Sequence, residues 1–386
     1  MGALAAGGAV VRLVGGCVRD AIVGRPVKDI DLATPDPPDQ VIARLKSAGI
    51  AAVPTGFAHG TVTAVIGKWG AQITTLRRDV DSDGRRATVA FIDDWEIDAK
   101  RRDLTINALY CDADGTVYDP LGGLADLDVG RVRFVGDPDR RIAEDALRIL
   151  RFFRFHAWYG RGAPDVGGLA ACARSDQLLA ALSGERVAGE LLRLLAAPDP
   201  TEVMAAMAAA GVLGVVLPEA ENLDRLAALV ALEVDGIGPD PERRLAAVMG
   251  GGGPAAACAA RRLRLANTAR ARLAVLAAPP LSPAADRDAR AARRALYRLG
   301  RERFIDLALL RRAAGEGSQA AYRAVLGTAR TWTAPRFPLR GADALALGIP
   351  EGPAVGRLMD AVQQWWEAGD FRAGRVACLR ELAARG

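Results

Sequence analysis

The stretch that decides the fold of this chain is LVGGCVRDAIVGRPVKDIDLAT, residues 13–34. An apolar run leads into Gly15 and Gly16, and a short helix is predicted to follow them. Glycine lets the backbone approach a ligand closely, and the N-terminus of a helix attracts anions. Arg19, one turn further on, can add a charge-assisted hydrogen bond. The first half of the stretch therefore predicts a turn in which Gly16 and Arg19 bind a triphosphate.

The second half of the stretch places two acidic residues on either side of an apolar one. On a strand, Asp29 and Asp31 share one face with Cα atoms about 6–7 Å apart, and Ile30 is expected to face the core. Mg²⁺ prefers hard oxygen ligands and also takes substrate phosphates and water. We therefore predict that Asp29 and Asp31 are catalytic residues that bind Mg²⁺ as the cofactor. A lone Gly-Gly or Asp-x-Asp is usually a solvated turn or strand edge, so their joint occurrence is the specific signal.

Outside this stretch the chain has a β-rich front and a helical remainder. Its 386 residues are too many for one compact core, and we expect two to four domains. Ser183 is predicted to cap a helix that ends at Leu195. Apolar spacing becomes helical from about residue 139. The predicted strands are residues 10–14, 61–66, 72–76, 87–91 and 106–111.

The net charge of +5 hides an uneven distribution. Residues 1–250 carry 28 basic and 35 acidic side chains, whereas residues 251–350 carry 18 basic and 6 acidic ones. Such asymmetry suggests a polyanionic partner for the basic segment. The alternative is genomic bias, since only four of the 51 basic residues are lysines, as a GC-rich genome would give.

Composition also limits the kind of site and the compartment. Two histidines, His59 and His156, cannot build a histidine-rich metal site. Five cysteines without a Cys-x-x-Cys pair suggest a reducing environment. We find no targeting signal and no apolar run long enough to span a bilayer. The sequence therefore predicts a cytoplasmic protein with no membrane association, and no obligate protein partner is evident.

Four ordered motifs in the first 160 residues resemble those of one enzyme family. Residues 13–34 resemble motif A of the nucleotidyltransferase superfamily, in its class II branch of CCA-adding enzymes and bacterial poly(A) polymerases. Residues 101–108, RRDLTINA, resemble that family's second motif, with Leu104 in place of the usual Phe. Residues 119–123, DPLGG, resemble its DPxGG turn, and residues 144–148, EDALR, resemble its EDxxR element.

The resemblance implies an α+β nucleotidyltransferase head with a mixed or antiparallel sheet, followed by an all-α neck, body and tail. The segments expected are the head at 1–127, a base-recognising neck at 128–195, a body at 196–265 and a partly basic, tRNA-binding tail at 266–386. The implied reaction is template-independent addition of C, C and A to tRNA 3′ ends from CTP and ATP. Implied nucleotide contacts are Arg102 with the triphosphate and Asp103 with a ribose hydroxyl, together with Asn107, Arg151 and Arg154.

Asp145 and Arg148 are the predicted base-recognising pair. Spaced three apart on one helix, they would be neighbours on its face, and the alternative is an ordinary ion pair. A carboxylate acceptor beside a guanidinium donor matches the Watson–Crick edges of both cytosine and adenine. Uracil and guanine would leave a buried charged group unpaired. One pair of residues could thus select CTP and ATP without a template.

Three further features separate the alternatives within the family. Residues 77–85 resemble the flexible loop of enzymes that add the terminal adenosine, and residues 56–62 resemble the CCA-adding form. Gln72 stands where many relatives carry an acid, so no third metal ligand is predicted. The alternatives are a poly(A) polymerase, an enzyme that adds only part of CCA, and a non-catalytic RNA-binding protein.

Overall fold

The structure is a computed structural model that describes residues 1–386 apart from residues 7, 83–86, 234–236 and 280–288. The chain forms two compact units. The first unit comprises residues 1–220 and 262–265, and the second comprises residues 221–261 and 266–386. This division does not separate a head from a neck, so the four segments predicted from sequence stay a prediction.

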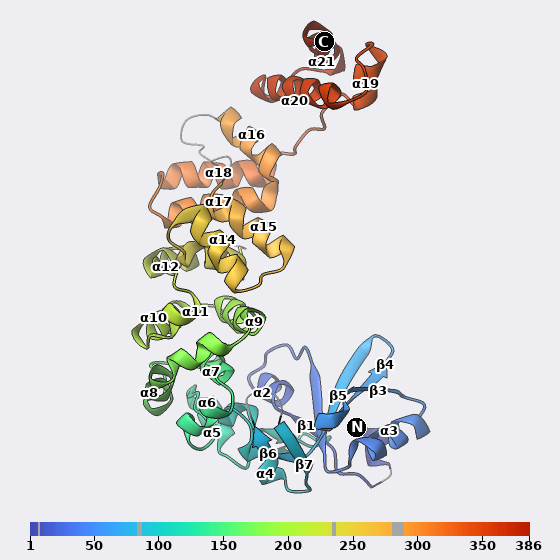
Figure 1. Ribbon diagram of the computed structural model, residues 1–386, viewed down its shortest axis with the longest axis vertical. Helices are drawn as coiled ribbons and strands as arrows, with labels where there is room; N and C mark the ends of the chain where they lie inside the picture. The colour runs from blue at the N-terminus through green and yellow to red at the C-terminus, as the bar shows by residue number, and fades with distance from the viewer. Residues whose placement is uncertain (7, 83–86, 234–236, 280–288) are drawn as a thin grey trace. The chain divides into compact units, whose positions relative to one another are not determined.

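The first unit begins with a seven-stranded sheet in the order β3-β4-β5-β2-β1-β8-β9 (Figure 1). β2 and β5 run parallel, and the other neighbouring strands run antiparallel, so the predicted mixed sheet is confirmed. Its strands are β1 (Arg12–Val14), β2 (Ile30–Thr34), β3 (Ala51–Gly56), β4 (Thr61–Ile66), β5 (Trp69–Thr75), β8 (Tyr110–Cys111) and β9 (Val117–Tyr118). β6 (Arg77–Ser82) and β7 (Ala87–Phe91) form a separate hairpin.

β2 is covered on both faces, which fixes the position of the acidic pair at its start. Leu32 packs with residues of α3 (Pro38–Ser47), and Ala33 packs on the opposite face with Ala99 of α4 (Trp95–Lys100). The prediction that Ile30 faces the core is wrong, because its side chain is 42% exposed. The pairing of β1 with β2 reaches only Leu32 and Ala33, so the core begins after Ile30.

The strand predicted at residues 106–111 is only partly formed. Residues 110–111 are β8, but Thr105–Asn107 is a 3-10 turn, η2. Its local hydrogen bonds run from Asn107 N to Leu104 O and from Ala108 N to Thr105 O. The Asn107 side chain also donates to Asp103, which draws this segment out of the sheet. The apolar pattern of residues 106–111 therefore predicted a longer strand than the one that forms.

Helices make up the rest of the first unit, as predicted. The predicted bounds of α9 are confirmed, with Ser183 at the N-cap position, although its side chain makes no capping hydrogen bond. The remaining helices are α1 (Gly2–Ala5), α2 (Gly16–Ile22), α5 (Gly123–Val129), α6 (Pro138–Glu144), α7 (Leu147–Tyr159), α8 (Val166–Arg174), α9 (Gly184–Leu195), α10 (Thr201–Ala209) and α11 (Val212–Val216), with 3-10 turns η1 (Phe57–His59) and η3 (Asp176–Ala181).

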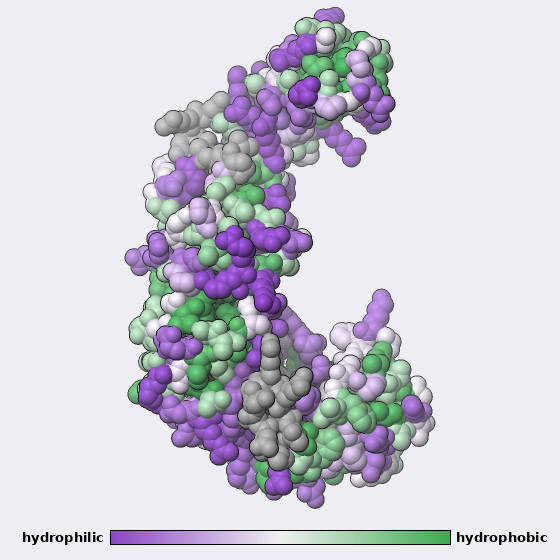
Figure 2. All heavy atoms as spheres, in the orientation of Figure 1, coloured by the Kyte–Doolittle hydropathy of each residue, from purple (hydrophilic) through white to green (hydrophobic). Residues whose placement is uncertain are grey.

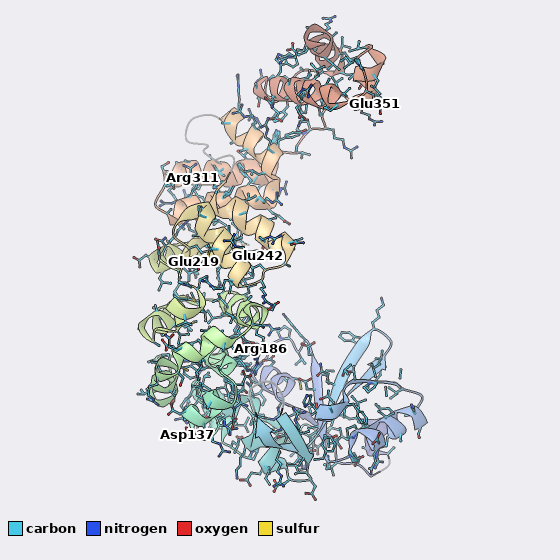
Figure 3. The ribbon with its side chains drawn as sticks, viewed as in Figure 1. Asp137, Arg186, Glu219, Glu242, Arg311 and Glu351 are labelled. Carbon is cyan, nitrogen blue, oxygen red and sulfur yellow. The ribbon has the colours of Figure 1, made fainter. Side chains whose placement is uncertain are left out.

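The described part of the second unit is entirely helical. Buried ion pairs join three of its helices, since Arg243 and Arg272 both donate to Asp306 at 2.9 and 2.7 Å. Arg272 also reaches Glu242, labelled in Figure 3. The helices are α12 (Leu223–Leu232), α13 (Pro241–Val248), α14 (Gly252–Arg262), α15 (Asn267–Ala277), α16 (Ala289–Leu299), α17 (Arg301–Ala313), α18 (Gln319–Thr331), α19 (Gly341–Ala346), α20 (Pro353–Ala368) and α21 (Arg375–Arg385).

Candidate active site

The turn between β1 and α2 forms one wall of the site. Gly15 has a φ of 72°, a left-handed conformation that favours glycine, and a Cβ there would lie 3.3 Å from an Arg102 nitrogen. Gly16 opens α2, whose Cys17 thiol donates to the carbonyl of Asp31 at 3.6 Å. One turn on, Arg19 is buried and donates to Asp20 and to the Asn107 side chain. The turn is therefore held against both β2 and η2.

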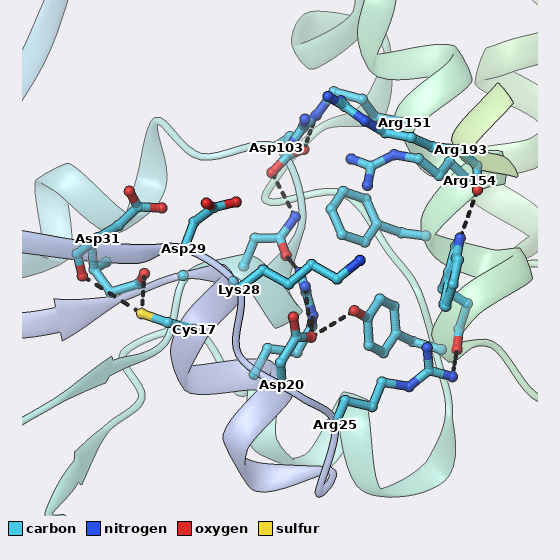
Figure 4. A pocket seen from close by; sticks show the side chains of 18 of the residues that line it. Cys17, Asp20, Arg25, Lys28, Asp29, Asp31, Asp103, Arg151, Arg154 and Arg193 are labelled. Carbon is cyan, nitrogen blue, oxygen red and sulfur yellow. Dashed lines mark hydrogen bonds and ion pairs between the residues drawn. The ribbon is translucent and has the colours of Figure 1, made fainter. Parts of the chain in front are cut away.

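Asp29 and Asp31 lie together at the start of β2 (Figure 4). Burial and the nearby charge of Asp29 raise the pKa of Asp31 above its ordinary value, while Arg102 acts in the opposite direction. Asp31 is also paired in register with Gln72 of β5, whose neutral amide adds no third carboxylate. Burial is therefore the main reason why the Asp31 carboxylate is harder to ionise than an exposed one.

The RRDLTINA motif forms the floor between the sheet and the helices. Arg102 pairs with the buried Asp98 at 3.2 Å. Asp103 accepts hydrogen bonds from Arg151 at 2.6 Å and from Asn107 at 3.1 Å. Burial alone would favour the protonated form, but these donors hold the pKa of Asp103 below its ordinary value. Both acids therefore serve to fix the guanidinium groups that surround the pocket.

The helical wall consists of arginines held by one buried acid. Glu190 of α9 is 4% exposed and accepts from Arg154. It also lies 4.0 Å from Arg151 and 3.4 Å from Arg193. The guanidinium carbon of Arg154 stacks 4.0 Å from the centre of the Phe155 ring. This wall is positively charged, and it faces the Gly15-Gly16 turn and the aspartates (Figure 4).

Together these elements enclose a pocket of about 940 Å³. Its size and polar lining suit a nucleotide together with the end of a second substrate. Nine of the eleven predicted site residues line it: Gly16, Arg19, Asp29, Asp31, Arg102, Asp103, Asn107, Arg151 and Arg154.

Asp145 and Arg148 are not among the residues that line this pocket. The prediction that they are neighbours on one helix is wrong, because the chain is extended at Asp145 between α6 and α7. The Asp145 carboxylate accepts from the N–H of Leu147 and pairs with Arg186 at 2.7 Å. Arg148 instead pairs with Glu144 at 2.6 Å. The hydrogen bond from the Leu147 N–H to the Asp145 side chain, two residues apart, is a local turn that competes with a continuous helix here.

Several residues of the site were missed by sequence reasoning. Tyr159 donates to Asp20 at 2.6 Å, and Arg25 donates to the Trp158 carbonyl at 2.9 Å. A charged residue on the apolar face of α9 was the available signal for Glu190, since Val187, Leu191 and Leu194 on that helix are buried. The missed residues that line the pocket include Asp20, Arg25, Lys28, Trp158, Tyr159 and Arg193.

Comparisons with known proteins agree with this architecture. Residues 11–133 match the family described as Poly A polymerase head domain, and residues 169–223 match the probable RNA and SrmB-binding site of polymerase A. The mouse mitochondrial CCA tRNA nucleotidyltransferase 1 is 33% identical over 381 residues, covering 94% of this chain and 84% of the relative. The chain belongs to the CCA tRNA nucleotidyltransferase family.

Other members of the CCA tRNA nucleotidyltransferase family support the same placement. The CCA-adding enzyme of Geobacillus thermodenitrificans is 38% identical over 200 residues, about half of each chain. The structure of the Bacillus stearothermophilus CCA-adding enzyme in complex with CTP superposes with a TM-score of 0.72 at 26% identity, covering 99% of this chain and 95% of that one.

The described residues contain neither a ready-made metal cluster nor a membrane-spanning helix. Within the part of the chain that the structure describes, no three His, Cys, Asp or Glu side chains gather in a way that could hold a metal ion. None of the described helices is both long enough and apolar enough to cross a membrane. The loop predicted at residues 77–85 lies partly outside the described residues.

Proposed function

We propose that this protein adds C, C and A in turn to the 3′ end of tRNA, using CTP and ATP and releasing pyrophosphate. The observation that carries the proposal is a pocket that joins two carboxylates, a glycine turn and an arginine wall. It occurs in a chain that aligns over 94% of its length with mammalian CCA tRNA nucleotidyltransferases.

In this reaction the RNA 3′-hydroxyl attacks the α-phosphorus of the nucleotide, and the bond from that phosphorus to pyrophosphate breaks. We assign Gly16, Arg19 and Arg102 to the triphosphate, because a backbone N–H and two guanidinium groups can offset its charge. The pairing of Arg102 with Asp98 holds its guanidinium toward the glycine turn, where a Cβ on Gly15 would contact it. The head thereby orients the reacting phosphate before the RNA arrives.

Asp29 and Asp31 fit a divalent cation, and we propose Mg²⁺. Two carboxylates with substrate phosphates and water form a ligand set that this ion accepts. Burial is the main cause of the raised pKa of Asp31, and a bound cation would favour its ionised form. When bound, Mg²⁺ would activate the attacking hydroxyl and stabilise the charge on the departing pyrophosphate.

For base selection we retain Asp145 and Arg148, with Asp103 assigned to a ribose hydroxyl. Asn107 of η2 and Arg151 and Arg154 of α7 are assigned to nucleotide contacts. Since Asp145 is paired with Arg186 and Arg148 with Glu144, base recognition requires these ion pairs to open or to be shared with the base. Rejection of UTP and GTP then follows from the cost of leaving a charged group unpaired.

The deciding experiment supplies a tRNA that lacks all three terminal nucleotides with labelled CTP and ATP, separately and together. We expect two additions with CTP alone and three with both nucleotides. A long ladder with ATP alone would indicate a poly(A) polymerase instead. No transfer with or without Mg²⁺, together with retained RNA binding, would indicate a non-catalytic RNA-binding protein.

We also propose a cytoplasmic location. All five cysteines are free, as expected in a reducing compartment. The mouse and human relatives are mitochondrial forms, so the compartment has to be tested directly by fractionation.

A further inference from the structure

The arginines that line the pocket already have partners within the protein. Each of these contacts satisfies part of the guanidinium group, so each arginine reaches a substrate phosphate only with its remaining donors. The pairs are Arg19 with Asp20, Arg102 with Asp98, Arg151 with Asp103, Arg154 and Arg193 with Glu190, and Arg25 with the carbonyl of Trp158.

Lys28 differs from these arginines. It lines the same pocket, it is exposed, and no hydrogen bond or ion pair of its amine is present among the described residues. It directly precedes Asp29, and its side chain extends across the pocket from the aspartates toward the arginine and aromatic wall (Figure 4). The Lys28 ammonium group therefore has no partner among the described residues and lies in a pocket lined by arginines.

We propose that the Lys28 amine binds a phosphate oxygen of the substrates during nucleotide transfer. The proposal rests on the proposed function and adds a substrate-binding residue to it. An ammonium group is a compact charge on a flexible stem, so it can follow an oxyanion as the bond to pyrophosphate breaks. Because no internal ion pair has to be broken first, its attraction to phosphate is not offset by a lost contact.

Two substrates could supply this phosphate oxygen, and both have the same chemistry. One source is the triphosphate of CTP or ATP, whose reactive end must lie near Asp29 and Asp31. The other source is the backbone phosphate next to the RNA 3′-hydroxyl, which must approach the same carboxylates. Steady-state measurements with one substrate varied and the other saturating separate the two.

The test compares Lys28→Met, Lys28→Arg and Lys68→Met with the unaltered chain. Lys68 is the matched control, because it is an exposed lysine in the turn between β4 and β5 and does not line the pocket. We expect Lys28→Met to lower kcat/KM by about 10²-fold, the usual cost of losing one donor to a reacting oxyanion. Lys28→Arg should recover part of this loss, and Lys68→Met should have no effect.

A second readout is direct binding of pyrophosphate and CTP, measured by calorimetry. Weaker binding of both by Lys28→Met supports the triphosphate, whereas a raised KM for tRNA with unchanged CTP binding supports the RNA phosphate. Unchanged kinetics and binding in Lys28→Met would overturn the proposal. A loss that Lys28→Arg does not relieve and that accompanies a lower unfolding temperature would also overturn it. If the unaltered chain adds nothing to tRNA, the proposed function fails instead.

Discussion

At the residue scale, the ionised carboxylate of Asp31 opposes folding. Its pKa is raised in the folded state, so the stability it contributes at acid pH is lost as the pH rises through that raised value. Asp31→Asn should therefore raise the unfolding temperature at pH 7 while lowering kcat by about 10³-fold. Calorimetry and the tRNA assay check both effects. Asp93→Asn, at an exposed acid of the same unit, should change neither.

Protonation of the same carboxylate should reduce kcat/KM at acid pH, which gives the pH profile an acid limb. Nucleotide transfer requires ionised Asp31, and its pKa lies above the ordinary value of 3.8 because of burial and Asp29. The value of kcat/KM should fall at acid pH as Asp31 is protonated, and more Mg²⁺ should move this limb to lower pH because a cation competes with the proton. A limb that does not move with Mg²⁺ would contradict a metal role for Asp31.

At the element scale, α9 positions the arginine wall through Glu190. Glu190→Gln should lower the free energy of unfolding by about 3 kcal/mol, because a buried charge loses its partner. It should also raise the KM for CTP as Arg154 and Arg193 become mobile. Urea unfolding and steady-state kinetics measure the two effects.

A control for Glu190 lies on the same helix. Glu185 pairs with Arg264 at 3.1 Å, and both side chains are more than half exposed. Glu185→Gln should leave the free energy of unfolding nearly unchanged, because an exposed ion pair contributes little to stability. Equal losses in both variants would mean that Glu190 has no special role in the wall.

The break between α6 and α7 places Asp145 where Arg186 can hold it. If Asp145 recognises the base, Asp145→Asn should raise UTP and GTP incorporation relative to CTP and ATP by about tenfold, since roughly one charged hydrogen bond changes. Incorporation with each nucleotide alone measures this ratio. Asp139→Asn, which removes the exposed ion pair between Asp139 of α6 and Arg174 of α8, should leave the ratio unchanged. An unaltered ratio in Asp145→Asn would remove Asp145 from base recognition.

At the scale of the whole molecule, the basic second unit predicts salt-sensitive tRNA binding. Some arginines of the second unit are neutralised by ion pairs within the protein. Arg293 pairs with Asp370 at 2.7 Å and Arg298 pairs with Glu367 at 2.6 Å. Arg294 on the same helix is exposed and has no ion pair among the described residues. In Figure 2 hydrophilic side chains gather beside α16. We therefore expect Arg294, and not Arg293, to contact RNA.

Salt titrations of the full chain test this expectation. Arg294→Gln should reduce the slope of log affinity against log salt by about one, as removal of one phosphate contact does. Arg293→Gln should leave the slope unchanged while lowering the unfolding temperature. Equal slopes in the unaltered chain and in both variants would mean that Arg294 does not contact tRNA.

Much of the site could be predicted from the sequence because its signals are local. The glycine turn, the Asp-x-Asp pair and the RRDLTINA motif each occupy a few adjacent residues, and all of them line the pocket. A β-rich front followed by helices was predicted from the spacing of apolar residues, and the mixed sheet was implied by the family resemblance. The bounds of β4, β7 and α9 are confirmed. Errors occurred where local hydrogen bonds outweighed the apolar pattern, as at η2 and Asp145.

The sequence by itself determined which chemical groups this protein has and in what order, because motifs and periodicity are properties of neighbouring residues. The tertiary structure alone decided which charges are already paired. Arg151 meets Asp103 across 48 positions, and Tyr159 meets Asp20 across 139. Such pairs depend on how helices pack against the sheet, which spacing along the chain does not encode. For that reason only the fold shows that Glu190 holds Arg154 and Arg193 at the pocket, and that Lys28 has no ion pair among the described residues.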